Sequence, residues 1–122
     1  MNRITILLLV FFALGALSGC NSQRTYSGYV NVCPVEEPYQ YVLFEVCNSD
    51  ESWWVVPEGE QYEEVLELYK QNSKDWCMQP AFARLQGSLS ASGEYGPEGR
   101  QAREFRLREV LEVRPLAEAS CP

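Results

Sequence analysis

The sequence predicts an all-β domain with a single helix, closed as a small five-stranded barrel and held by two disulfides. Five short segments are rich in aromatic and β-branched residues, and one amphipathic helical pattern separates the third from the fourth. Four cysteines follow the N-terminal region. The 122 residues, 46% hydrophobic and 22% charged, have the length and composition of one folded domain.

The first three strands are expected at residues 26–32, 39–46 and 53–56. Their side chains are largely aromatic or β-branched, which suits a pleated and half-buried surface. Each segment is followed by residues that interrupt a strand: Cys33-Pro34, then Asn48-Ser49-Asp50, then Pro57.

After the third strand the pattern changes to a helical period. Apolar side chains recur at positions i, i+3, i+4 and i+7, namely Tyr62, Val65, Leu66 and Tyr69. Glu63, Glu64, Glu67 and Lys70 occupy the other side. The pattern predicts an amphipathic helix of about ten residues.

The fourth and fifth strands are expected at residues 81–89 and 104–113, joined by a long loop. In the fourth strand, Ala81, Ala83, Leu85 and Leu89 face inward and Phe82, Arg84, Gln86 and Ser88 face outward. In the fifth, Phe105, Leu107, Leu111 and Val113 face inward, and Val110 outward. Glu109 breaks this alternation, so a β-bulge is expected at residues 109–110.

The order β-β-β-α-β-β, with the helix between strands three and four, is that of the OB barrel. Spacing alone leaves three pairings of four cysteines open. In the OB topology, strand one ends beside the start of strand four, and strand five ends near the turn between strands two and three. This topology favours the disulfides Cys33–Cys77 and Cys47–Cys121.

The N-terminus has the layout of an export signal. A basic start at Arg3 precedes an apolar run, and Leu17-Ser18-Gly19-Cys20 resembles the lipobox of bacterial lipoproteins. The resemblance implies a signal peptide at residues 1–19, diacylglycerol on Cys20, a tether over residues 20–27 and a barrel domain over 28–122. Asn21, where an aspartate would favour inner-membrane retention, favours the periplasmic face of the outer membrane.

Residues 26–121 resemble the C-terminal OB domain of the NlpE-type envelope lipoproteins. The resembling segments are Phe44-Glu45-Val46-Cys47, Glu51-Ser52-Trp53-Trp54-Val55, residues 82–87, residues 93–96, residues 103–107 and residues 110–113. Those proteins are linked to surface sensing and envelope-stress signalling. This chain lacks their N-terminal barrel with its C-x-x-C motif.

Composition excludes several functions. A net charge of −7 disfavours nucleic-acid binding. The absence of histidine removes the serine–histidine and cysteine–histidine catalytic pairs and the commonest metal ligand. No calcium-loop motif occurs. We therefore expect no metal, no cofactor and no enzymatic activity.

The candidate binding residues are aromatic or basic. Trp53 and Trp54 are consecutive, so one belongs to the core and the other is exposed or partly so. The long loop over residues 90–103 is the other candidate binding element, with Tyr95 at its tip and Arg100 near it. Arg106, Arg108 and Arg114 share a strand face that Glu104 and Glu112 interrupt, which favours cross-strand ion pairs over an anion site.

These observations predict a lipid-anchored binding module that contacts another envelope protein or a cell-wall component. The alternative is an inhibitor of a cationic cell-wall hydrolase of the lysozyme type, because residues 36–75 hold eleven carboxylates and only two lysines.

Overall fold

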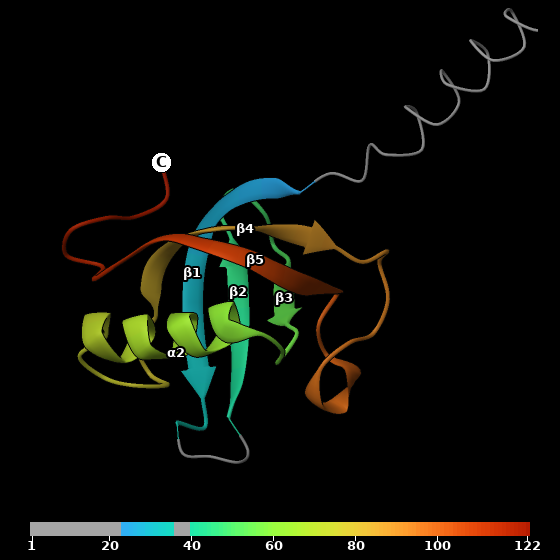
Figure 1. Ribbon diagram of the computed structural model, residues 1–122, viewed down its shortest axis with the longest axis horizontal. Helices are drawn as coiled ribbons and strands as arrows, with labels where there is room; N and C mark the ends of the chain where they lie inside the picture. The colour runs from blue at the N-terminus through green and yellow to red at the C-terminus, as the bar shows by residue number, and fades with distance from the viewer. Residues whose placement is uncertain (1–22, 36–39) are drawn as a thin grey trace, which may run out of the picture.

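Five strands close into a barrel in the order β1-β2-β3-β5-β4 in the computed structural model (Figure 1). The structure describes residues 23–35 and 40–122. The predicted signal segment and Cys20 lie outside the described residues. The strands are β1 (Arg24–Cys33), β2 (Tyr41–Val46), β3 (Ser52–Val55), β4 (Ala81–Leu89) and β5 (Arg103–Arg114), with helix α2 (Glu60–Asn72) and the 3₁₀ turn η1 (Pro97–Gly99).

The strand pairing confirms the predicted OB arrangement. β1 pairs antiparallel with both β2 and β4, and the barrel closes through a short parallel pairing of β3 with β5. Val30 near the end of β1 lies opposite Ala81 at the start of β4, as that topology requires. Pairing starts at Arg24 opposite Gly87, so the barrel begins within the segment that was expected to be a tether.

The core fills the barrel and continues under the helix. Phe44, Trp53 and Phe105 lie with ring centroids 5.9–6.0 Å apart, and Tyr26 meets Trp53 edge-on at 4.9 Å. The helix buries the four side chains that its sequence period predicts, Tyr62, Val65, Leu66 and Tyr69. The helix spans 13 residues rather than about ten.

β5 is irregular, as expected, but its two register shifts flank residues 109–110 rather than falling on them, and they change which side chains face inward. Arg84 pairs with Glu112 but Leu85 pairs with Val110, so Leu111 is left without a partner in the ladder. A second shift lies between Gln86 and Gly87. Val110 consequently packs against the core and Leu111 is 41% exposed, so both predicted orientations were wrong. Each extra residue reverses the alternation.

Phe82 lies on the outer face of β4, as predicted, but this face is covered here and the side chain is only 6% exposed. Its ring meets Tyr29 of β1 edge-on, with centroids 6.3 Å apart. The C-terminal segment reaches this region, where the backbone N–H of Cys121 donates to the Tyr29 hydroxyl at 2.9 Å. The outer face of β1 and β4 is therefore apolar and covered here.

Both predicted disulfides are confirmed. Cys33–Cys77 joins the end of β1 to the turn before β4, with the Cα atoms 4.9 Å apart. Cys47–Cys121 joins the end of β2 to the C-terminal segment, with the Cα atoms 5.5 Å apart. The two bridges span 44 and 74 residues of chain, so each restricts a large part of the unfolded ensemble.

Candidate functional site

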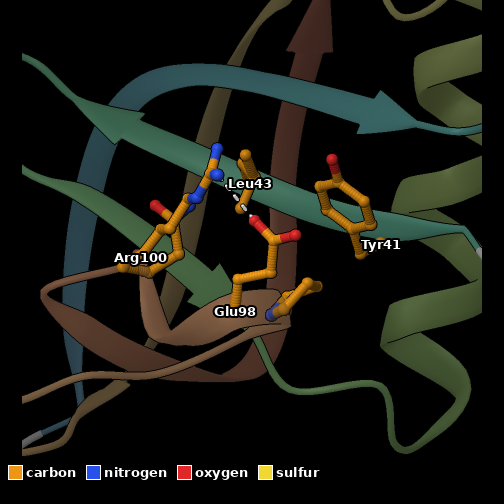
Figure 2. Close-up of a pocket in the computed structure, with 6 residues that line it drawn as sticks. Tyr41, Leu43, Glu98 and Arg100 are labelled. Atoms are coloured by element: carbon orange, nitrogen blue, oxygen red, sulfur yellow. Dashed lines mark ion pairs between the residues drawn. The ribbon is translucent and has the colours of Figure 1, made fainter.

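A pocket of about 380 Å³ lies between the outer face of β2 and the loop that joins β4 to β5. Figure 2 shows Tyr41 and Leu43 on the strand, with Glu98 and Arg100 facing them from the loop. Its lining residues come from these two elements alone: Tyr41, Leu43, Pro97, Glu98, Arg100 and Gln101. This is the side of an OB barrel on which ligands bind, through the face of strands two and three and the adjoining loops.

The strand forms the apolar wall of the pocket. Val42 and Phe44 are fully buried in the barrel. Because side chains alternate along a strand, Tyr41 and Leu43 point outward, and both are half-buried. Leu43 lies opposite Trp54 of β3, which extends the same outer surface.

The loop packs closely on Trp54 at a glycine, Gly96. Gly96 has φ 75° and ψ −170°, a conformation that only glycine adopts readily. A Cβ atom added at Gly96 would lie 2.9 Å from Cγ of Trp54. The close approach of backbone to indole therefore requires glycine, and it fixes the loop against the outer face of β3.

Backbone hydrogen bonds make the loop an ordered hairpin. The N–H of Tyr95 donates to the carbonyl of Gln101 at 2.9 Å, and the N–H of Gln101 donates back at 3.0 Å. Nearer the barrel, the N–H of Gly93 donates to the carbonyl of Ala102 at 2.9 Å. The turn at the tip is thus held in place before any ligand arrives, which limits the entropy lost on binding.

The tip carries one carboxylate and one guanidinium. Glu98 has φ 61°, the left-handed region that is uncommon for a residue with a side chain. Its carboxylate Oε2 lies 2.7 Å from a guanidinium nitrogen of Arg100. The two side chains are 69% and 75% exposed, so both can reach a ligand at the pocket mouth.

A polar network holds the base of the loop. Glu51, just before β3, accepts a hydrogen bond from Nε1 of Trp53 at 3.1 Å and forms an ion pair with Arg103 at 3.2 Å. Arg103 also donates to the carbonyl of Ser90 at 3.0 Å. The Trp53 hydrogen bond is the main cause that lowers the pKa of Glu51, and Arg103 acts in the same direction.

The four residues predicted as candidates lie in different environments. Trp53 is the core member of the pair, 3% exposed, and presents no free indole face. Trp54 lies under the loop at Gly96. Tyr95 braces the hairpin by donating from its hydroxyl to the carbonyl of Ala91 at 3.0 Å. Only Arg100 lines the pocket.

The loop over residues 90–103 was predicted as a candidate as a whole, without singling out its lining residues Pro97, Glu98 and Gln101, and Tyr41 and Leu43 of β2 were missed. The sequence did contain a signal for Tyr41 and Leu43. The alternation that buries Val42 and Phe44 turns Tyr41 and Leu43 outward, on the strand that the OB topology places beside the loop between strands four and five.

Arg106 and Arg114 of β5 form ion pairs, as the interrupting glutamates predict, whereas Arg108, the third arginine of that predicted face, forms none among the described residues. Arg106 pairs with Glu104 of its own strand and with Glu58 of the β3–α2 connection. Glu112 lies 3.5 Å from Arg84 and 3.3 Å from Arg114. These pairs are substantially exposed, so each contributes little to stability, and they leave β5 without a concentrated positive surface.

Within residues 23–35 and 40–122 there is no group of three or more metal-ligating side chains. The same described part of the chain contains no helix long and apolar enough to cross a membrane. Comparisons of the chain with protein-family models, curated proteins and solved structures find no match. The resemblance to NlpE-type lipoproteins therefore stays a prediction.

Proposed function

We propose that this protein is a lipid-anchored, non-enzymatic binding module of the bacterial cell envelope, and that its ligand occupies the pocket between β2 and the β4–β5 loop. The observation that carries the proposal is this preformed pocket, with an apolar wall and a polar rim.

The proposed anchor lies near one end of the barrel. Only three residues separate Cys20 from Arg24, so the start of β1 stays within roughly 14 Å of the lipidated cysteine. Tyr41 lies opposite Cys33 at the other end of β1, about 30 Å further along the strand. The loop that forms the opposite side of the pocket leaves β4 close to Gly87, which pairs with Arg24 at the anchored end of the barrel.

Binding rather than catalysis suits the chemistry of the lining. Glu98 is the single carboxylate among the lining residues, and it is exposed and paired with Arg100. Acid–base catalysis of hydrolysis commonly requires two groups held in different protonation states. The lining offers one such group, at the mouth of the pocket rather than in its interior.

Site-specific photo-crosslinking in cells tests the proposal. A benzophenone amino acid replaces Tyr41 in the full-length lipidated chain, and the control chain carries it at Gln71, an exposed position on α2. We expect a discrete adduct from position 41 that is absent from position 71 and weakened by Arg100→Ala. Identical, diffuse capture from both positions would contradict a ligand site on β2.

A second candidate function, inhibition of a cationic hydrolase of the lysozyme type, is favoured by the outer face of α2. Its glutamates are exposed along the helix: Glu60, Glu63, Glu64 and Glu67. Inhibition by this face should weaken at high salt, because the contact is electrostatic. Substituting Glu63 and Glu67 by glutamine should weaken it at low salt, while Arg100→Ala should leave it unchanged. An enzyme that stays fully active with excess protein at low salt would exclude this function.

A further inference from the structure

We infer that the ligand of this pocket is a neutral saccharide, a class of ligand that presents an apolar ring face together with hydroxyl groups. The inference rests on the proposed binding function and adds the chemistry of the ligand. It follows from three properties of the site: the charge of its rim, the character of its wall, and its size.

The rim favours an uncharged ligand with hydroxyl groups. Glu98 and Arg100 contribute one charge of each sign, 2.7 Å apart. A ligand carboxylate or phosphate that approaches Arg100 would have to displace the Glu98 carboxylate and would remain close to it. A hydroxyl group meets no such penalty, since it accepts a hydrogen bond from the guanidinium and donates one to the carboxylate.

Gln101 adds another uncharged-ligand contact to the rim, because it too can bind a hydroxyl group as donor and as acceptor. Its side-chain amide both donates and accepts, and it lines the pocket on the same side as Glu98 and Arg100. Three neighbouring side chains therefore supply planar donors and acceptors, which suits several adjacent hydroxyl groups better than one strongly charged group.

The opposite wall is apolar and carries an aromatic ring. Tyr41 and Leu43 project from β2 (Figure 2), and Pro97 at the start of η1 also lines the pocket. A pyranose ring has a face of C–H groups that packs on such a surface, while its hydroxyl groups point sideways toward the rim. A fully polar ligand would leave this wall without complementary contacts.

The volume of the pocket and the net charge of the chain limit the classes of ligand further. A volume of about 380 Å³ is at the lower end for small-molecule pockets, so the site takes one or two rings rather than a long chain. A single-stranded nucleic acid, the other common ligand of OB barrels, is disfavoured by the net charge of −7.

The test is an NMR titration of the ¹⁵N-labelled chain, made soluble by Cys20→Ala, with both disulfides formed. The neutral probes are N,N′-diacetylchitobiose, cellobiose and maltose, and the acidic probe is a uronic-acid disaccharide. We expect at least one neutral probe to give saturable shifts at the amides of Leu43, Glu98 and Gln101, and the acidic probe to bind more weakly.

Two variants at position 41 distinguish the loss of the aromatic contact with the ligand from a loss of folding. Tyr41→Ala should weaken the binding of that neutral probe at least tenfold, which corresponds to about 1.4 kcal/mol. Tyr41→Phe keeps the ring and should bind within about twofold of the parent chain, a difference of roughly 0.4 kcal/mol. The amide spectrum of each variant without ligand shows whether the barrel remains intact.

Three outcomes would overturn the inference: no neutral probe shifts the pocket amides, the acidic probe binds more tightly, or the shifts lie outside the pocket. If the discrete crosslink from position 41 persists in any of these cases, the binding function stands and only the ligand class is wrong. If that crosslink is also missing, both proposals fail.

Discussion

Gly96 is the residue at which the geometry of the loop can be tested most directly. In Gly96→Ala, the backbone at φ 75° and ψ −170° becomes unfavourable by about 1–3 kcal/mol. The new Cβ would also lie 2.9 Å from Cγ and 3.1 Å from Cβ of Trp54. Such overpacking costs about 1–3 kcal/mol, so we expect a total loss of roughly 3 kcal/mol.

The chain provides a matched control in the same turn. Gly99 also has a positive φ, 65°, but a Cβ added there would meet only Cβ of Glu94, at 3.4 Å, which is ordinary contact. Gly99→Ala should therefore cost only the backbone term, about 1–2 kcal/mol. The difference between the two variants measures the packing of the loop on Trp54.

Urea unfolding gives the free energies, and amide hydrogen exchange at Tyr95 and Gln101 shows whether the hairpin opens locally. A double-mutant cycle with Trp54→Ala removes two of the three close atoms and should recover part of the Gly96→Ala loss. If Gly96→Ala costs no more than Gly99→Ala, the loop is not held by its seat on Trp54.

Three further predictions concern stability and anchoring. Replacing both Cys47 and Cys121 by alanine should lower the free energy of unfolding by about 4 kcal/mol, because the bridge closes a 74-residue separation; a loss below about 1 kcal/mol in urea unfolding would refute the loop-entropy argument. Glu51→Gln should destabilise the domain at neutral pH. Since the folded state holds the pKa of Glu51 below its ordinary 4.5, this stabilisation is present above that value and lost as the pH falls through the lowered pKa. A pH series of unfolding curves should therefore converge in acid, and a gap that stays constant would contradict the assignment. Finally, Cys20→Ala should move the protein from the membrane to the soluble fraction on cell fractionation, and material that stays with the membrane would exclude lipidation at Cys20.

Much of the fold could be predicted because its determinants are local. The helical period of Tyr62, Val65, Leu66 and Tyr69 identifies the buried face of α2, and the structure buries those four side chains. The order of the elements then limits the topology, and the topology selects one disulfide pairing out of three. Both confirmed bridges follow from this sequence of steps.

The errors arise where non-local contacts decide the outcome. The alternation of Val110 and Leu111 depends on how β5 registers with β4, and the register shifts that reverse it lie at Arg108 and Leu111 rather than at the predicted residues 109–110. Phe82 is buried because Tyr29 lies beside it on the neighbouring strand. Because these partners are distant in sequence, a strand considered in isolation gives Val110 and Leu111 the wrong orientations and does not show that Phe82 is covered.

By itself, the sequence determined the class of fold, the buried face of the helix and the cysteine pairing, because periodicity and element order encode them directly. The pocket was decided by tertiary structure alone. Tyr41 and Leu43 come from one strand, and Glu98 and Arg100 come from a loop more than fifty positions later. They meet only because the barrel closes and Gly96 lets the loop rest on Trp54, a contact that depends on the absence of a single Cβ atom.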